Sequence, residues 1–437
     1  MPAPPEAEDT AATARHHRKR AFTLGVGNGA LFEVVISTMQ PGLVLSAFLL
    51  KLTDSTFYAS LPLALMHLGA LWPQLIVAHI AEGMPYKKPI YVWSGIARIS
   101  MLVLMAAATA LWPAGADHGL ALLFLGLYFL YTSANGAGGI GFMEMVAKTV
   151  PTTRRGRFMG MRGFFGGLCG LATGFYVRHM LGAGGPAFPG NYALLFATAS
   201  AFLVAAVVVY AAVPEPPSDL RRNRGSFVSH LRRGWDTLGQ DRNYRLLVWT
   251  RLALAASMAG QVLFIPYAIK ELHLPESIVG VLMVIAAVFS LPSNFLWSHL
   301  SDRHGNRRLL LVAATAFCLV PACAVASYHA PADGPLTTAG YGPNALLFIV
   351  AFMLGAVATR GGFMGSTNYL LEIAPEERRP SYMAFMRVLQ APTVLMPLVG
   401  GTVAEWISFQ AAFLLSGLAA LVTLALVLRL DEPRRAP

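Results

Sequence analysis

The chain has 437 residues, of which 55% are hydrophobic and only 13% are charged. Because roughly 25% of the residues of a soluble globular protein are charged, this composition excludes a soluble domain and favours a membrane protein. The net charge of +11 is compatible with a nucleic-acid binder, but the positions of the basic residues, given below, argue against that class.

The N-terminal segment, residues 1–20, reads MPAPPEAEDTAATARHHRKR. It contains prolines, acids and then a basic cluster, but it lacks the apolar core and cleavage site of a signal peptide. We predict that it is a disordered cytoplasmic tail.

Long apolar runs recur through the rest of the chain. A run of about 20 residues is enough to cross the ~30 Å hydrocarbon core of a bilayer as a helix, and the runs here fall into two sets of six. The sequence therefore predicts an all-α membrane protein with twelve transmembrane helices. We place them at residues 21–50, 57–80, 89–112, 120–145, 158–181, 191–213, 246–270, 277–300, 309–328, 345–372, 382–403 and 408–429.

An internal duplication supports the division into two sets. Residues 121–124 and 345–348 both read ALLF. The same offset of 224 residues aligns prolines and paired arginines in the loops that follow, namely Pro151 with Pro375, Arg154 with Arg378 and Arg155 with Arg379. We predict two pseudo-symmetric six-helix halves, residues 21–213 and 246–430, an arrangement found in secondary transporters.

Two further segments are expected in the cytoplasm: a linker between the halves, residues 214–245, and a C-terminal tail, residues 431–437. Within the linker, Phe227, Leu231 and Trp235 recur at helical spacing while arginines take another face. This pattern favours an amphipathic helix on anionic lipid. A solvated basic linker is the alternative.

The basic residues are distributed unevenly between the two sets of loops. Of the 33 lysines and arginines, 25 lie in the termini and the even-numbered loops, three lie in the odd-numbered loops and five lie within the predicted helices. The positive-inside rule then places both termini in the cytoplasm. We expect a multi-pass protein of the plasma membrane, or of the inner membrane in a Gram-negative host. This topology accounts for the net charge without nucleic acid.

The loop SHLSDRHGNRR, residues 298–308, separates the eighth and ninth predicted helices. It keeps Asp302, Arg303 and Gly305 of a G-x-x-x-D-R-x-G-R-[KR]-[KR]-like pattern. With this loop and its two halves, the chain resembles the major facilitator superfamily over roughly residues 20–430. Members of that family carry such a loop after helix 2 and often a second copy after helix 8, and the resemblance implies their twelve-helix fold.

The first copy of this loop, AHIAEGMPYKKP, keeps the acid Glu82 and two lysines. An acid at a helix end can face the positive N-terminus of another helix, and arginines can pair with carboxylates. We therefore predict a cytoplasmic gate in which Asp302 meets the start of the fifth helix near Arg157 and Glu82 meets the start of the eleventh. A purely topological role for the basic residues is the alternative. The gate residues are Asp302, Arg303, Arg307, Arg308, Glu82, Arg154, Arg155, Arg378 and Arg379.

Two charged residues lie near the middle of predicted helices, where insertion of a charge costs about 2.5 to 3.5 kcal/mol. Glu33 lies about 12 residues into the first helix and Arg360 about 15 residues into the tenth, roughly 18 and 22 Å deep at 1.5 Å per residue. The resemblance implies that helices 1, 4, 7 and 10 line the substrate cavity. The predicted substrate-binding residues are Arg360, Glu33, Asn135, Gln261, Tyr131, Ser37 and Gln40.

We expect Arg360 to hold an anionic group of the substrate and Glu33 to carry a coupling proton, because burial favours the neutral form of a carboxyl group. A pairing of Glu33 with Arg360, either between substrates or as a static structural link, is the alternative. Of the other intramembrane charges, we predict that Arg98 pairs with Glu144 and that Arg162 reaches toward the cytoplasmic surface or the loop acids Glu376 and Glu377.

These features favour a secondary active transporter that moves a small organic anion or zwitterion by alternating access, coupled to protons. The alternatives are an exporter of amphipathic drugs or lipids and a non-transporting receptor that shares the fold. We expect no enzyme activity, no cofactor and no metal site, since the three cysteines lack zinc-ligand spacing. The expected partners are a small-molecule substrate and the lipid bilayer, and the chain is expected to act as a monomer that binds no nucleic acid.

Overall fold

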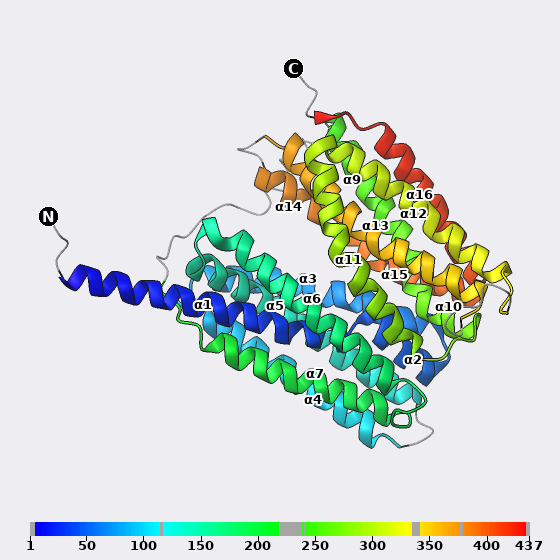
Figure 1. Ribbon diagram of the computed structural model, residues 1–437, viewed down its shortest axis with the longest axis horizontal. Coiled ribbons are helices and arrows are strands. Elements are labelled where there is room, and N and C mark those ends of the chain that lie inside the picture. Colours follow the sequence, from blue (N-terminus) through cyan, green and yellow to red (C-terminus); the bar gives the residue numbers. More distant parts are fainter. Residues whose placement is uncertain are drawn as a thin grey trace. The chain divides into compact units, whose positions relative to one another are not determined.

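The computed structural model describes residues 5–113, 117–217, 238–239, 241–333, 341–375 and 379–433. Its regular elements over these residues are helices (Figure 1), which confirms the all-α fold predicted from the sequence. The chain divides into two compact units. Unit 1 comprises residues 1–40 and 65–222, and unit 2 comprises residues 41–64 and 223–437.

Unit 1 is a bundle in which α1 packs against α6 and α7, and α4 packs against α5 and α7. The close approach of α3 and α5 depends on Gly136, because a Cβ atom there would lie 2.5 Å from the carbonyl oxygen of Ala70. Small residues at such crossings let helix backbones pack directly in a membrane. The helices are α1 (Pro5–Thr38), α3 (Thr56–Glu82), α4 (Lys88–Leu111), α5 (Asp117–Thr149), α6 (Thr152–Met180) and α7 (Gly190–Ala211).

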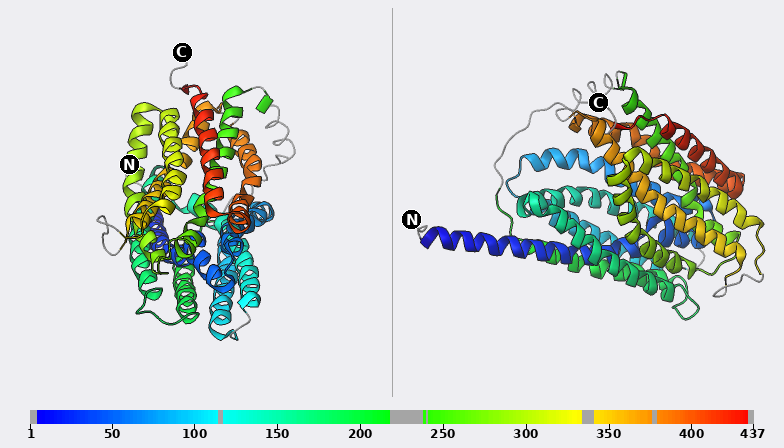
Figure 2. Two further views of the ribbon diagram at one scale, coloured as in Figure 1. Left: turned by 90° about the vertical axis from the view of Figure 1, so that its right-hand side faces the viewer. Right: turned by 45° about the horizontal axis from the view of Figure 1, so that its top comes forward.

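Within unit 2, α13 packs against α11 and α12, and α16 packs against α9 and α12. Figure 2 shows the helices of this unit running alongside one another from two further directions. The elements are η1, a π-helix (Pro41–Leu45), α2 (Ser46–Thr53), α9 (Arg242–Ser257), η2, a 3-10 helix (Met258–Leu263), α10 (Phe264–Lys270), α11 (Ile278–His304), α12 (Asn306–His329), α13 (Pro343–Ile373), α14 (Arg379–Gln390), η4, a 3-10 helix (Ala391–Leu395), α15 (Met396–Trp406) and α16 (Phe409–Leu428).

Among the described residues, the first, seventh and eleventh predicted membrane helices are interrupted. The first changes to the π-helix η1 at Pro41, which has no backbone NH to continue the α-helical pattern. The seventh passes through η2 and the eleventh through η4. The interruption at η2 carries Gln261, one of the predicted substrate-binding residues.

Nine helical segments in the described part of the chain are long and apolar enough to cross a membrane, with α1–η1–α2 and α9–η2–α10 each counted once. The other three predicted spans coincide with α3, α6 and α14–η4–α15. α6 is rich in glycine and arginine, and the last of these segments is broken at η4. Twelve membrane crossings therefore remain a prediction.

α1 begins at Pro5, so residues 5–20 are helical in the structure, whereas the sequence suggested a disordered tail. Figure 1 shows the first turns of α1 extending beyond the neighbouring helices of unit 1. Alanine and the straight-chain charged residues of this segment favour a helix, and a helix that has already formed is readily extended. The amphipathic helix predicted in the linker falls mainly on residues 218–237, which lie outside the described residues.

Residues 41–64 belong to unit 2, whereas the sequence placed them in the N-terminal half. Lys51 forms a 2.8 Å ion pair with Glu276, and Lys270 forms a 3.0 Å ion pair with Asp54. Lys51 and Lys270 are two of the three basic residues that the predicted topology places in odd-numbered loops. These two lysines, which the positive-inside rule does not explain, therefore have a structural role in their ion pairs with carboxylates.

The first residues of α3, up to Ala64, belong to unit 2, and a carboxylate from α15 of the same unit caps the start of this helix. Glu405 at the end of α15 accepts hydrogen bonds from the backbone NH of Thr56, at 2.7 Å, and from the hydroxyl group of Thr56. An acid at this position satisfies a free NH group and lies at the positive end of the helix dipole. This contact also fixes the segment 41–64 to the rest of unit 2.

Glu215 joins three segments of unit 1. Its carboxylate accepts hydrogen bonds from the backbone NH groups of Lys87 (2.5 Å) and Lys88 (2.8 Å) and forms a 2.6 Å ion pair with Lys148. Burial raises the pKa of the Glu215 carboxyl group, but the hydrogen bonds outweigh burial and hold that pKa below its ordinary value of 4.5. A carboxyl group with a lowered pKa in the folded state stabilises the fold above its unfolded-state pKa and loses that contribution as the pH falls.

We predict that Glu215→Gln lowers the thermal unfolding temperature near pH 7 by several degrees, because loss of a charged hydrogen-bond acceptor costs about 1.5 to 3 kcal/mol. The difference from the native chain should shrink as the pH falls below the ordinary carboxyl pKa of 4.5 and toward the lowered pKa of Glu215 in the folded state. Thermal unfolding in detergent across this pH range measures both effects. Glu144→Gln, at an exposed position of α5, is the control, and identical behaviour of the two variants would contradict the role of Glu215.

Candidate functional site

Asn28 of α1 is the centre of a buried hydrogen-bond network in unit 1, and its side chain is satisfied on both atoms. The amide nitrogen donates to the hydroxyl group of Tyr91 on α4 and to the carbonyl oxygen of Ala206 on α7, each at 2.8 Å. The amide oxygen accepts a 2.8 Å hydrogen bond from Arg162 on α6. With 1% of its surface exposed, Asn28 links four helices inside the bundle.

Arg162 lies between helices and does not reach toward the cytoplasmic surface as predicted. Besides its bond to Asn28, it donates to the carbonyl oxygen of Gly25 at 3.0 Å. Its guanidinium group lies 4.5 Å from the ring centroid of Phe142, a cation–π distance. Gly29 makes room for it, because a Cβ atom at that position would overlap the Arg162 side chain. The prediction for Arg162 was wrong because glycine at this position of α1 leaves room for its long side chain between the helices.

Glu33 lies one turn of α1 beyond this network and packs against the glycine-rich face of α6. A Cβ atom at Gly166 would lie 3.6 Å from one carboxylate oxygen of Glu33, and a Cβ atom at Gly170 would lie 3.8 Å from the other. A Cβ atom at Gly170 would also lie 3.4 Å from the hydroxyl oxygen of Ser37, which is on the same face of α1. Since Gly166 follows Arg162 by one helical turn, the Glu33 carboxylate and the Arg162 guanidinium occupy adjacent turns of the α1–α6 contact.

Arg98 of α4 carries a buried guanidinium group in unit 1, with 2% of its surface exposed. It donates to the side-chain oxygen of Asn135 at 3.1 Å and to the carbonyl oxygen of Ser94 at 3.3 Å. Its guanidinium group lies 5.5 Å from the ring centroid of Phe32 and 5.6 Å from that of Tyr91. The remaining nitrogen, Nη2, is buried and has no hydrogen-bond partner among the described residues.

The predicted ion pair of Arg98 with Glu144 is wrong. Glu144 is exposed on α5, and the ion pairs among the described residues do not include it. The partner of Arg98 on α5 is instead Asn135, which lies nine positions before Glu144. Two predicted residues of α5 thus differ in role: Asn135 contacts Arg98, while the ring of Tyr131 stacks on Tyr128 with centroids 6.0 Å apart.

In unit 2, Gln261 of η2 contacts α13 close to Arg360. Thr359, a residue that the sequence analysis did not single out, donates a 3.4 Å hydrogen bond to the Gln261 side-chain oxygen. The Gln261 amide nitrogen is buried without a partner among the described residues. Arg360, the next residue on α13, is exposed. Gln40, at the end of α1 in unit 1, likewise has a buried side-chain oxygen that lacks a partner in the described chain.

The loop at residues 298–308 is fixed to unit 2 by its polar residues. Gly305 separates α11 from α12 with a φ of +85°, which favours glycine. Asn306 accepts a 2.7 Å hydrogen bond from the Ser301 hydroxyl group and donates a 2.9 Å bond to Glu372 of α13. Arg307 donates to the carbonyl oxygen of Leu428 at the end of α16, at 2.9 Å. Part of the predicted gate loop therefore has a structural role in connecting α11, α12, α13 and α16.

The other predicted gate residues fall into three groups. Asp302, Arg303, Arg308 and Arg154 are exposed. Arg155 instead caps the end of α5, where it donates to the carbonyl oxygens of Ala147 (2.8 Å) and Val150 (3.2 Å). The remaining predictions lie outside the described residues or side chains, namely Arg378 and the side chains of Glu82 and Arg379. The gate remains a prediction.

Comparison with known proteins gives one family. Residues 247–437 match the model of the Major Facilitator Superfamily. The chain is 23% identical over 193 residues to Multidrug resistance protein 1 of Bacillus subtilis (strain 168), covering 44% of this chain and 46% of that protein. It is 29% identical over 141 residues to Sugar efflux transporter B of Salmonella typhimurium, covering 32% and 34% respectively. The chain thus spans half or less of the length of these curated relatives.

Solved structures resemble nearly the whole chain. The structure of a bacterial homologue of the iron transporter ferroportin in an inward-facing state has a TM-score of 0.72 at 14% identity, covering 94% of this chain and 98% of that one. A D-xylose–proton symporter has a TM-score of 0.69 at 14% identity, covering 95% and 98%. At these identities the likeness shows the fold alone. The fold and its apolar helices define a multi-pass membrane protein.

The family match and the curated relatives make the assignment more specific. Residues 247–437 match the Major Facilitator Superfamily, the family that the repeated halves and the loop at residues 298–308 led us to expect. These matches leave the subfamily open.

We predict that Asn28→Ala lowers the stability of unit 1 by about 1.5 to 3 kcal/mol, because it removes a hydrogen bond to the charged and partly buried Arg162 side chain. Thermal unfolding in detergent measures the loss, which corresponds to a shift of several degrees. Ser100→Ala on α4 is the matched control, since that exposed hydroxyl group bonds only within its own helix. An unfolding temperature for Asn28→Ala equal to that of the control would contradict the network.

Proposed function

We propose that the chain is a secondary active transporter that moves a small organic anion or zwitterion across the membrane, coupled to protons. The observation that carries the proposal is the buried Arg98 guanidinium, whose Nη2 has no hydrogen-bond partner among the described residues. A buried charged donor that lacks an acceptor is costly, by more than the 1–3 kcal/mol of a neutral group. An anionic substrate group would supply the missing acceptor.

The surroundings of Arg98 support an anion more than a cation. Asn135 and the backbone of Ser94 satisfy its other nitrogens, and the aromatic rings of Phe32 and Tyr91 exclude water from its faces. Arg162, whose guanidinium group is partly buried, adds positive charge on the same bundle. We assign to Arg98 the role of a binding residue for the substrate anion within unit 1.

Unit 2 would contribute a second cationic contact through Arg360. This exposed residue follows Thr359, which bonds to the Gln261 side chain, and the amide nitrogen of Gln261 lacks a partner among the described residues. A long flexible guanidinium beside an amide donor suits a carboxylate or the acidic end of a zwitterion. In an alternating-access cycle, the substrate site would open to one side of the membrane and then to the other.

Glu33 is the residue to which we assign the proton. It packs on the glycine face of α6 in the turn next to Arg162, so a change in its charge acts directly on the network that Asn28 and Arg162 share. The structural relative titled a D-xylose–proton symporter supports proton coupling as a property that this fold accommodates.

Export of sugars or amphipathic drugs is the second candidate. It is favoured by the two curated relatives, whose names refer to multidrug resistance and sugar efflux. These substrates are uncharged or carry a positive charge in many cases, so they would not need Arg98. Substrate charge therefore distinguishes the two candidates.

We predict that Arg98→Gln and Arg360→Gln each lower the transport of a carboxylate substrate about tenfold or more, since a charge-assisted hydrogen bond contributes about 1.5–3 kcal/mol and 1.4 kcal/mol is a factor of ten. The measurement is uptake into liposomes from a panel of labelled mono- and dicarboxylates and sugars. Arg178→Gln, at the exposed end of α6, is the matched control. Transport of sugars alone, unchanged in all three variants, would favour the second candidate, and binding without uptake would indicate a receptor.

We predict that Glu33→Gln preserves substrate exchange between equal pools but removes the dependence of net uptake on a pH gradient, because the amide cannot carry a proton. Counterflow and pH-driven uptake in the same liposomes measure the two properties separately. Glu144→Gln controls for loss of a carboxylate elsewhere in unit 1. Undiminished pH-driven uptake by Glu33→Gln would assign the proton to another residue.

A further inference from the structure

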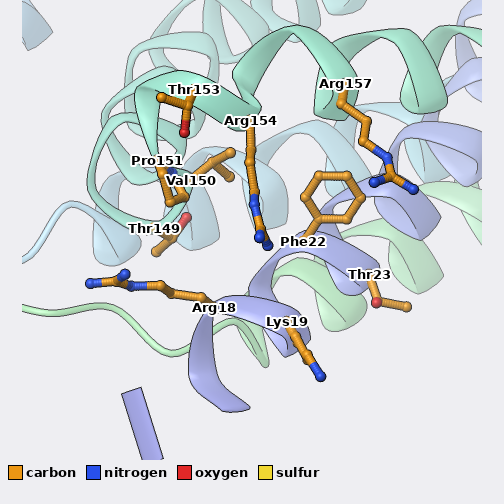
Figure 3. Close-up of a pocket in the computed structure, with 10 residues that line it drawn as sticks. All are labelled: Arg18, Lys19, Phe22, Thr23, Thr149, Val150, Pro151, Thr153, Arg154 and Arg157. Atoms are coloured by element: carbon orange, nitrogen blue, oxygen red, sulfur yellow. The ribbon is translucent and has the colours of Figure 1, made fainter. Parts of the chain in front are cut away.

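Unit 1 contains a pocket of about 750 Å³ that is separate from the network of Asn28, Arg98 and Arg162. It lies between the start of the membrane part of α1 and the junction of α5 with α6. Figure 3 shows Arg154 extending from α6 toward α1, with Phe22 of α1 beside it. The lining residues that matter to its chemistry are Arg18, Lys19, Phe22, Val150, Arg154 and Arg157.

The lining is strongly basic and, among the side chains that the structure describes, includes no acidic residue. Arg18, Lys19, Arg154 and Arg157 are all exposed, and none of them belongs to an ion pair among the described residues. Arg155, between the two α6 arginines, is already used to cap α5. Four like charges around one cavity repel one another, and an anion bound among them would relieve that repulsion.

The α6 terminus adds hydrogen-bond donors to this charge. α6 begins at Thr152, and its N-cap residue, Pro151, supplies no side-chain cap. The first NH groups of a helix have no carbonyl partner within the helix, and the helix dipole places partial positive charge there. Thr153 adds a hydroxyl group to the pocket lining. Charged side chains and backbone donors together suit the three or four oxygens of a phosphate group.

One side of the pocket is apolar. Phe22 packs edge to face on Phe158 with ring centroids 5.5 Å apart, and the buried Val150 belongs to the same cluster. Phe22 is the second residue of the first predicted membrane span, and Arg157 directly precedes the fifth, so the pocket lies at the expected cytoplasmic boundary of the bilayer. An apolar wall below a basic rim matches a phospholipid, which presents a phosphate group above acyl chains.

We propose that this pocket binds the phosphate group of an anionic phospholipid at the cytoplasmic face of the membrane. A free phosphate ion shares the same binding chemistry. The lipid is the favoured source because Phe22 and Val150 offer an apolar surface that a free ion does not use. The proposal is independent of the substrate, since no residue of the pocket belongs to the Arg98 or Arg360 sites.

The test removes one positive charge from α1 and one from α6. The native chain and the variant Arg18→Gln/Arg154→Gln are placed in nanodiscs of phosphatidylcholine containing phosphatidylglycerol, and retained lipid is counted by native mass spectrometry. Arg20→Gln/Arg429→Gln is the matched control, because it removes two exposed charges at the same expected face without touching the pocket. The native chain and the control should retain phosphatidylglycerol over phosphatidylcholine, and the pocket variant should lose this preference about tenfold or more.

A second arm distinguishes the two sources of phosphate. In nanodiscs of phosphatidylcholine alone, inorganic phosphate is titrated against each protein while thermal unfolding is followed. Stabilisation of the native chain and the control, but not of the pocket variant, combined with no lipid preference, would support a phosphate site and overturn the lipid as its occupant. Equal lipid retention and equal phosphate response in all three proteins would overturn the proposal as a whole.

Discussion

The guanidinium groups of Arg98 and Arg162 impose the main constraint on unit 1, because a charge removed from water has to find its partners inside the bundle. Arg162 finds them in Asn28, the carbonyl oxygen of Gly25 and the ring of Phe142. The same Asn28 binds Tyr91 and the backbone of α7, so satisfying one charge also fixes how four helices pack. Arg98 is held by Asn135 but retains one buried nitrogen without an acceptor in the described chain. That difference separates a structural cation from one that is available to a ligand.

The two ends of the helices differ in how far their basic residues are paired with carboxylates. On the expected cytoplasmic side, basic residues exceed their carboxylate partners, as the lining of the basic pocket shows. On the opposite side, two of the three basic residues are paired, Lys51 with Glu276 and Lys270 with Asp54. The positive-inside rule explains where the excess lies, and the pocket at Arg154 shows that part of this excess is gathered into a concave surface. Because Arg157 is also the predicted partner of Asp302 in the gate, lipid bound in the pocket would act on the same charge as the gate.

The sequence predicted those features that depend on local pattern. Apolar runs located the helices, and the loop at residues 298–308 led to the family. The partners of the buried charges could not be predicted in this way, because they depend on the rotation of each helix about its axis. Asn135, nine residues before Glu144 on α5, is the neighbour of Arg98, and the glycines of α1 that admit Arg162 have no charge pattern to signal them. The helical start of α1 and the membership of residues 41–64 in unit 2 likewise follow from packing and hydrogen bonds between segments far apart in sequence.

The central claim is that the unsatisfied nitrogen of Arg98 holds an anion. The most direct measurement is the thermal stabilisation of the purified protein by a panel of mono- and dicarboxylates, compared between the native chain and Arg98→Gln, since a ligand that binds only the folded state raises the unfolding temperature. The account predicts that at least one carboxylate stabilises the native chain and that this stabilisation is lost in Arg98→Gln but retained in Arg178→Gln. Equal stabilisation of the native chain and Arg98→Gln by the same carboxylate would contradict it.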